Sequence, residues 1–248
     1  MEYLSSLAFL FKLVLRSVLI GPLRGKPIRW RRVFQELDEI GLRSLSIILI
    51  TSFSIGLILV FILANQLKPL GAETSVPSFV TLVLTRELAP LLTGLVLAGR
   101  VGASITAKLG TQKVNEEILA LETMAIDPIG YLVAPRVIAS VIMLPTLVII
   151  ADFAGLFGGF LVGTFGIGID FDRYWINTVH ALNNGDIFTG IFKVFVFGLI
   201  ISLIGTYQGI TVEGGAQEVG HSTMVSVMTS TIMIIISDAI ITGVLYAI

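Results

Sequence analysis

The sequence has no cysteine among its 248 residues and only two histidines. Without cysteine the chain cannot form a disulfide, a thiolate metal site or a thiol nucleophile. The two histidines, His180 and His221, are isolated from each other and do not match the spacing of metal ligands. These absences exclude cysteine-based catalysis and give no support to a metal centre.

Charge is also scarce. Charged residues make up 13% of the chain, whereas a soluble domain usually has about a quarter. Hydrophobic residues make up 55%, and the mean hydropathy is +0.95. This composition predicts an integral membrane protein. The net charge of −1 leaves no excess of basic residues that could bind nucleic acid.

The N-terminal segment 4–20 is apolar but lacks the features of a signal peptide. No basic residue precedes the apolar run, and no small-residue cleavage site follows it. Lys12 and Arg16 are four residues apart and therefore share one helical face. We expect a retained amphipathic helix that lies in the headgroup layer, with a membrane-spanning helix as the alternative.

Long segments with few charges predict an all-α, polytopic membrane protein with five transmembrane helices. Segment 29–43 places Trp30, Val33 and Phe34 on one stripe among charges, which predicts a second surface helix. Residues 1–43 would thus form an N-terminal interfacial region and residues 44–248 the five-span domain. The predicted spans are 44–66, 78–107, 135–164, 187–211 and 223–247. The second span is long enough to be tilted or bent near Pro90.

The distribution of basic residues predicts the orientation of the chain. Most of the 16 Lys and Arg residues lie in the N-terminal region and around the connection between spans two and three. The positive-inside rule places these parts in the cytoplasm. With five spans, the C-terminus would lie on the outer side. There, Tyr174 and Trp175 in the polar segment 170–186 are expected to anchor a short helix at the membrane surface.

The connection between spans two and three has an acidic, amphipathic sequence. Residues 112–126 are too short to cross the bilayer, and we expect them to form a cytoplasmic helix that stops at Asp127 and Pro128. The helix would have an apolar stripe flanked by glutamates, formed by Val114, Ile118, Leu121 and Ala125 beside Glu116, Glu117 and Glu122. Two interpretations remain open at this point. The helix packs on its own spans, or it docks in a groove of a soluble partner.

Five ionisable residues fall within the predicted spans: Arg86, Glu87, Asp152, Lys193 and Asp238. Each such residue needs a partner, a pathway or an aqueous cavity. We expect Arg86, Glu87, Lys193 and Asp238 to border a cavity that binds a lipid headgroup. The alternatives are ion pairs that only join spans, and a Lys193 that snorkels outward. Because adjacent Arg86 and Glu87 point about 100° apart on a helix, each is expected to find a separate partner.

Small residues recur every four positions in two of the spans. They are Gly94, Ala98, Gly102 and Thr106 in the second span, and Gly155, Gly159 and Gly163 in the third. Such faces allow two helix backbones to approach closely. The contact can lie within the chain or between two copies of it.

Several motifs together resemble the MlaE family of permeases. The resemblance covers about residues 40–248. The matching positions are Arg86-Glu87-Leu88, Pro90, Ala98 to Gly102, Glu116-Glu117, Ala120-Leu121, Met124, Asp127-Pro128, Tyr131-Leu132-Val133, Pro135-Arg136, Asp152, Gly155 and Gly158-Gly159.

The resemblance implies an ABC transporter permease of the bacterial inner membrane that moves phospholipids or related lipids between membranes. Its implied partners are a second copy of the chain, a cytoplasmic ATPase dimer, an external MCE-domain lipid-binding protein and a small cytoplasmic accessory subunit. Segment 112–127 would be the coupling helix seated on the ATPase. Its contact residues would be Glu116, Glu117, Leu121, Met124, Asp127 and Pro128.

The chain has no nucleotide site of its own. The nearest sequence to a phosphate-binding loop starts at Gly21, but it is one residue short and has Pro27 where Ser or Thr should hold magnesium. We therefore expect ATP and magnesium to bind a partner chain, and this chain not to be an enzyme. A proton- or ion-coupled carrier of an amphipathic substrate is the alternative function. An intramembrane hydrolase lacks support because neither Asp152 nor Asp238 has suitable flanking motifs.

Overall fold

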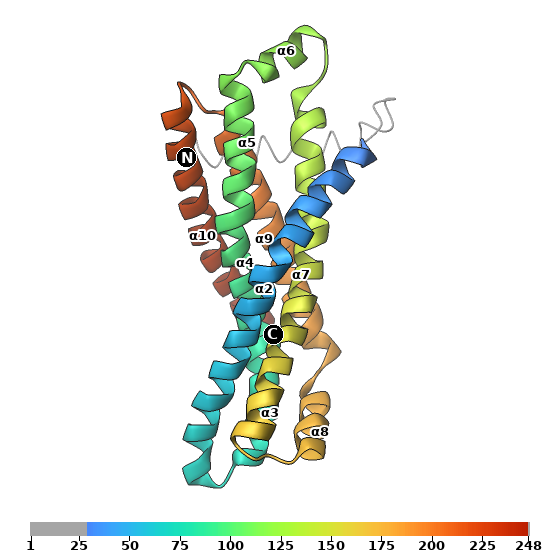
Figure 1. Ribbon diagram of the computed structural model, residues 1–248, viewed down its shortest axis with the longest axis vertical. Coiled ribbons are helices and arrows are strands. Elements are labelled where there is room, and N and C mark those ends of the chain that lie inside the picture. Colours follow the sequence, from blue (N-terminus) through green and yellow to red (C-terminus); the bar gives the residue numbers. More distant parts are fainter. Residues whose placement is uncertain (1–28, 248) are drawn as a thin grey trace. The chain divides into compact units, whose positions relative to one another are not determined.

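The computed structural model describes residues 29–247, and in this range all regular structure is helical, without strands (Figure 1). Five helical segments are long and apolar enough to cross a membrane: Trp30–Leu70, Glu73–Val114, Ile129–Gly166, Asn184–Ile210 and Ala216–Leu245. The prediction of an all-α polytopic membrane protein is confirmed. The predicted N-terminal helix at 4–20 lies outside the described residues.

The first span is part of a longer helix, α2 (Trp30–Leu67). The prediction of a separate surface helix at 29–43 is therefore wrong, because the amphipathic segment continues into the apolar one without a break. The change from charged to apolar residues alters the surroundings of the helix but does not interrupt its backbone hydrogen bonds. Gly41 does not break the helix, and a Cβ atom there would collide with the side chain of Met143.

The second span contains two π-helical turns. It runs through α3 (Val76–Val83), η4 (Leu84–Leu88), α4 (Ala89–Leu97), η5 (Ala98–Gly102) and α5 (Ala103–Val114). A π turn inserts one extra residue into a helix and is often found at functional sites. The irregularity expected near Pro90 takes this form, since η4 ends two residues before the proline. Two further π turns, η6 (Ile129–Val133) and η7 (Val162–Gly166), flank α7 (Ala134–Leu161).

The chain divides into two compact units, which are described separately. The first unit contains the described residues of 29–43, 94–143 and 195–247, and the second contains 44–93 and 144–194. The division falls within α2, α4, α7 and α9 (Asn184–Ile210), so each of these helices contributes residues to both units.

In the second unit, α8 (Phe171–Ala181) is the short helix expected in the polar segment 170–186, and it lies beside α3 (Figure 1). Asn177 fastens α8 by donating a 2.7 Å hydrogen bond to the carbonyl oxygen of Thr74. Tyr174 is buried against Gly163, and its burial raises the pKa of the phenol, so its hydroxyl stays neutral. The expectation of an interface anchor is wrong for Tyr174, whereas Trp175 is 59% exposed.

Helices α2 and α7 approach closely in the second unit because both carry glycine at the contact. A Cβ atom on Gly56 would collide with the carbonyl oxygen of Gly155. A Cβ atom on Gly158 would likewise overlap the carbonyl oxygen of Phe53. Gly155 and Gly159 therefore serve contacts within the chain, which decides between the two interpretations of this glycine stripe.

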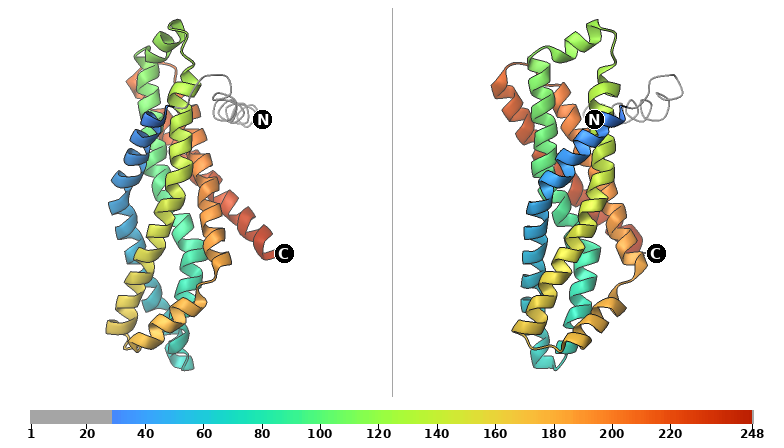
Figure 2. Two further views of the ribbon diagram at one scale, coloured as in Figure 1. Left: turned by 90° about the vertical axis from the view of Figure 1, so that its right-hand side faces the viewer. Right: turned by 45° about the vertical axis from the view of Figure 1, so that its right-hand side comes forward.

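In the first unit, α10 (Ala216–Ala247), red in Figure 2, runs beside α5, green in the same views. The Thr106 hydroxyl lies at this contact, 3.0 Å from the Gly205 carbonyl oxygen and 2.9 Å from the Ser226 hydroxyl. Gly209 of α9 also faces α5, since a Cβ atom there would lie 2.6 Å from the Cβ of Leu109. Small and hydroxyl residues thus join α5, α9 and α10.

We expect Gly56→Ala to destabilise the protein by about 1–3 kcal/mol, because the added methyl group must displace the backbone of α7. Gly220→Ala is the matched control. A Cβ atom at Gly220 has no neighbour within 4 Å, so this exchange should be neutral or slightly stabilising through helix propensity. Thermal unfolding in detergent measures both. Equal unfolding temperatures for the two variants would contradict the close α2–α7 contact.

Candidate functional site

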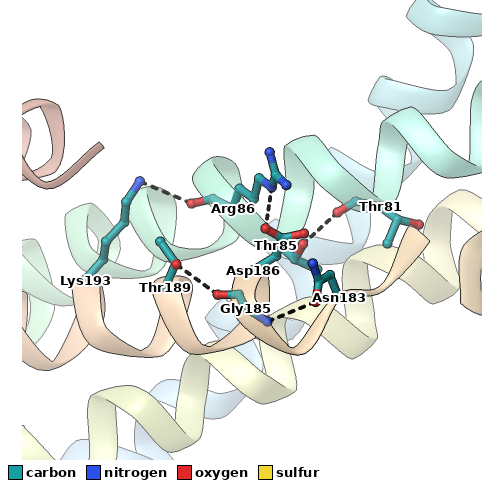
Figure 3. Close-up of polar contacts among 8 residues, drawn as sticks. All are labelled: Thr81, Thr85, Arg86, Asn183, Gly185, Asp186, Thr189 and Lys193. Carbon is teal, nitrogen blue, oxygen red and sulfur yellow. Dashed lines mark hydrogen bonds and ion pairs between the residues drawn. The ribbon is translucent and has the colours of Figure 1, made fainter. Parts of the chain in front are cut away.

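Four charged side chains form two ion pairs between η4 and α9 in the second unit, and Figure 3 shows three of them, Arg86, Asp186 and Lys193. The Arg86 Nε atom lies 2.6 Å from Asp186 Oδ1, and the Lys193 Nζ atom lies 2.6 Å from Glu87 Oε2. Adjacent Arg86 and Glu87 thus have separate partners, as their divergence on the helix predicted. Pairing of this kind offsets the cost of placing ionisable groups in membrane-spanning segments.

The register of α9 brings both partners to the same face. Asp186 and Lys193 are seven residues apart, close to two helical turns, and so they lie above one another. Gly190 lies between them, and a Cβ atom there would be 2.7 Å from the carbonyl oxygen of Thr85 and 3.2 Å from Pro90 Cγ. The glycine therefore allows the backbone of α9 to approach η4 within reach of both ion pairs.

Pro90 explains a second interaction of Lys193. Proline has no N–H, so the carbonyl oxygen of Arg86, four residues earlier, lacks the donor that an α-helix would provide. The Lys193 ammonium donates a 3.2 Å hydrogen bond to this oxygen (Figure 3). The whole Lys193 residue is 0% exposed. The alternative that Lys193 snorkels outward is therefore wrong, since its ammonium joins a carboxylate and a freed carbonyl inside the unit.

Each pair has one buried and one more accessible member. The side chains of Arg86 and Glu87 are each 33% exposed, compared with 10% for Asp186 and 0% for Lys193. The second carboxylate oxygen of Asp186 has no hydrogen-bond partner within the described part of the chain. The site thus exposes one cation, Arg86, and one anion, Glu87, on η4. Each is paired with a less exposed counter-charge on α9.

Asp186 is not among the predicted site residues, because it falls in the polar segment before the predicted fourth span. Its spacing of seven from Lys193 was a usable signal, because it places a carboxylate on the same helical face as the buried ammonium. The start of α9 at Asn184, earlier than predicted, brings Asp186 into the helix.

The other two intramembrane acids belong to other helices. Asp238 is buried on α10 in the first unit, and its predicted contact with a headgroup stays a prediction. Asp152 lies on α7 in the second unit, and its buried Oδ1 atom has no hydrogen-bond partner within residues 29–247. In the same range, no group of three His, Cys, Asp or Glu residues could hold a metal ion.

The connection between spans two and three is helical over a shorter range than predicted. Glu116 has a left-handed backbone with φ 60°, so α5 ends at Val114 and the separate helix α6 covers only Glu117–Thr123. Ala125, with φ 57°, turns the chain before Asp127 is reached. The predicted single helix over 112–126 is therefore wrong, because two left-handed residues interrupt it.

The apolar residues of α6 lie on a buried and an exposed face, whereas the sequence predicted a single apolar stripe. Ile118 is buried and Leu121 half-buried, so these residues pack on the chain itself. Leu119 and Met124 are 54% and 61% exposed, although both are large and apolar. Leu119 is not among the predicted contact residues, because that prediction requires one unbroken helix that continues from α5.

Charged and aromatic contacts tie both sides of this connection to α2 within the first unit. Before it, Lys108 of α5 pairs with Glu39. After it, Arg136 of α7 pairs with Glu36 at 3.2 Å. The Arg32 guanidinium lies 3.6 Å from the ring centre of Tyr131 in η6, and Arg29 lies 4.3 Å from the same ring. A displacement of α6 would therefore act on α2 as well as on α5 and α7.

Comparison with known families identifies the chain. The model of the family Permease MlaE matches residues 33–244, which include η4, α9 and the α6 connection. The chain belongs to the MlaE permease family.

Known permease proteins are similar to the chain over most of their length. The chain is 41% identical over 237 residues to a probable ABC transporter permease protein of Rickettsia typhi, covering 96% of this chain and 90% of the relative. It is 32% identical over 234 residues to the intermembrane phospholipid transport system permease protein MlaE of Haemophilus influenzae, covering 92% and 89%. The protein is thus an ABC transporter permease, a membrane subunit rather than a classical enzyme.

Lys193→Met should destabilise this permease by about 1.5–3 kcal/mol, because the partly exposed carboxylate of Glu87 loses a charged hydrogen bond. The double variant Glu87→Gln/Lys193→Met removes both charges, and we expect it to recover a large part of that loss. Thermal unfolding of wild type, both single variants and the double variant in detergent gives the coupling between the two residues. Strictly additive effects would show that the pair does not contribute to stability.

Proposed function

We propose that this MlaE-family permease moves phospholipids or related lipids between membranes, driven by a separate ATPase. The observation that carries the proposal is the family match across residues 33–244, together with the relative from Haemophilus influenzae that is named for phospholipid transport. The charged residues of η4 and α9 support it, since they offer both signs of charge to a zwitterionic or anionic headgroup.

In this proposal, Arg86 and Glu87 act as exchangeable partners for the headgroup. Arg86 would pass from Asp186 to a lipid phosphate, because a guanidinium binds both carboxylate and phosphate through paired N–H groups. Glu87 would hold an amine of the headgroup or maintain the charge of Lys193 while the lipid passes. Both side chains are partly exposed, whereas Asp186 and Lys193 are buried and would keep the site in place.

The α6 connection would receive the force of ATP hydrolysis. Its exposed Leu119 and Met124 provide apolar anchors beside Glu116, Glu117 and Glu122, a pattern that suits docking in a groove of a soluble protein. Asp127 and Pro128 would hold the end of the segment, where Asp127 Oδ1 accepts a 3.1 Å hydrogen bond from the Ile129 amide. Leu121, predicted to contact the ATPase, would instead pack against the rest of this chain and hold α6 in place.

Movement of α6 would then pass into the first unit through α5, η6 and α7. The Glu39–Lys108 and Glu36–Arg136 pairs would make α2 follow these helices. Because α2 and α7 both continue into the second unit, the displacement reaches the unit that carries Arg86 and Glu87.

The proposal includes a setting and a set of partners. The permease would lie in the bacterial inner membrane with its N-terminus in the cytoplasm and its C-terminus in the periplasm. It would assemble with a second copy, a cytoplasmic ATPase dimer that binds ATP and magnesium, an external MCE-domain lipid-binding protein and a small cytoplasmic accessory subunit.

One observation favours the alternative of proton-coupled transport. The Oδ1 atom of Asp152 is buried and has no hydrogen-bond partner in the described part of the chain, as a proton acceptor would. Reconstituted transfer distinguishes the two functions. The ABC proposal requires ATP and the ATPase, whereas transfer that runs on a proton gradient without ATP would replace it with the carrier.

Replacing Glu87 or Asp238 by its amide should lower lipid transfer about tenfold while leaving the complex assembled, since one charged hydrogen bond to the headgroup is lost. Transfer of a fluorescent phospholipid from proteoliposomes to acceptor vesicles measures the effect, and co-purification with the ATPase measures assembly. Asp172→Asn, at an exposed acid of α8, is the control and should transfer normally. Loss of assembly in either variant would show that the residue is structural.

Leu119→Asp and Met124→Asp should each weaken binding of the ATPase at least about tenfold, because a charge replaces an apolar interface anchor. Ile176→Asp is the matched control, since Ile176 is 50% exposed on α8 and should not contact the ATPase. Co-purification from detergent and stimulated ATPase activity measure the effect. Full retention of the ATPase by both α6 variants would exclude this face as the docking site.

A further inference from the structure

A charged pocket lies within the first unit, apart from the ion pairs of η4. Helices α2, α5 and α7 and the π turn η5 line it, and its volume is about 230 Å³. A water molecule occupies roughly 30 Å³ in the liquid, so the pocket has room for a larger polar group. Its ionisable lining residues are Glu36, Glu39, Arg43, Arg100, Lys108 and Arg136. We call it the basic pocket, because its cations outnumber its carboxylates.

The ion pairs of the basic pocket use only part of its positive charge. Glu39 pairs with Lys108, and Glu36 pairs with Arg136. Arg43 is exposed at the pocket and takes part in none of the ion pairs found among residues 29–247. The lining thus keeps an excess of positive charge after its carboxylates have been paired, and such an excess favours an anion.

Arg136 provides a second and independent indication of an anion. The residue is only 5% exposed, and its Nη1 atom is buried without a hydrogen-bond partner in the described part of the chain. Its Nε atom binds Glu36 and its Nη2 atom donates a 3.5 Å hydrogen bond to Gln112 Oε1, so Nη1 is the group that needs another acceptor. Buried polar groups without partners are uncommon in native structures and often mark an ion or water that binds there.

The position of the pocket along the helices indicates where the anion comes from. Arg43 directly precedes the charge-free segment 44–66, Lys108 directly follows the predicted span 78–107, and Arg136 is the second residue of the predicted span 135–164. Three of the four cations therefore lie at the ends of apolar segments, where a bilayer would place its lipid headgroups. Basic pockets between helices at the cytoplasmic membrane surface bind phosphate-containing headgroups.

We infer that the basic pocket binds a phosphate group, with Arg136 and Arg43 as its main donors. The phosphate reaches it either as the headgroup of an anionic phospholipid or as free inorganic phosphate, and the depth of the pocket favours the lipid. Ser104 also lines the pocket, and its hydroxyl can donate to the same oxyanion. This site is distinct from the proposed headgroup site at Arg86, and its occupancy requires neither ATP nor a partner protein.

Native mass spectrometry of the purified full chain, titrated with phosphatidylglycerol, tests the inference. Wild type should bind one phosphatidylglycerol tightly at the basic pocket, in addition to any lipid at the Arg86 site. Arg43→Gln should bind the pocket lipid about tenfold more weakly, because one charge-assisted hydrogen bond is lost. Arg43→Lys keeps the charge but loses the planar fork, so its affinity should fall between the two. Arg43 is exposed and lacks an ion pair among the described residues, so none of these variants should unfold the protein.

Two further ligands distinguish a lipid headgroup from free inorganic phosphate as the source of the phosphate. Diacylglycerol, which has the same acyl chains without a phosphate, should not occupy the site. Inorganic phosphate alone should bind more weakly than phosphatidylglycerol if the lipid is the ligand, and equally well if the pocket takes free phosphate.

Lys113→Gln is the matched control for surface charge, since Lys113 is an exposed cation of α5 that does not line the pocket. It should bind phosphatidylglycerol like wild type. An equal loss in Lys113→Gln and Arg43→Gln would overturn the inference, as would unchanged binding in Arg43→Gln or equal retention of diacylglycerol. Because no step of this experiment involves transport, its failure is distinguishable from failure of the proposed function.

Discussion

Charge inside an apolar segment is the constraint on which the second unit depends. A lone ionised side chain in a span would destabilise the protein by several kcal/mol, so Arg86, Glu87, Asp186 and Lys193 are stable there only as a connected set. Pro90 adds a freed carbonyl oxygen to this set, which the ammonium of Lys193 satisfies. The π turn and Gly190 bring the backbones close enough for all these contacts to form. The close helix packing at Gly190 and the two ion pairs therefore stabilise the same contact between η4 and α9.

The first unit uses ion pairs differently. Its pairs between α2 and the helices on either side of α6 lie at the ends of apolar segments, where they hold an exposed connection to the body of the unit. The same region carries more cations than carboxylates, and the surplus gives it a capacity for anions. This arrangement suits the role proposed for the region, which would take up force and also meet the lipid surface.

Much of the architecture could be predicted from composition and hydropathy. The five spans and the helical class follow from long apolar segments, since in lipid a backbone must satisfy its own hydrogen bonds. The divergence of Arg86 and Glu87 correctly predicted separate partners. The details of the connection could not be predicted. Left-handed conformations at Glu116 and Ala125 are unusual for these residue types. The sequence therefore contains no signal that α5 ends at Val114 or that Leu119 is exposed.

The sequence by itself determined that the chain is a helical membrane protein of the MlaE type, because span length, charge scarcity and local motifs are properties of short segments. Only the tertiary structure decided which charges meet. Asp186 and Lys193 are about 100 residues from their partners on η4, and their pairing depends on the rotation of α9 and on its approach at Gly190. Pairing between distant helices depends on register and distance, which packing sets and local sequence does not encode.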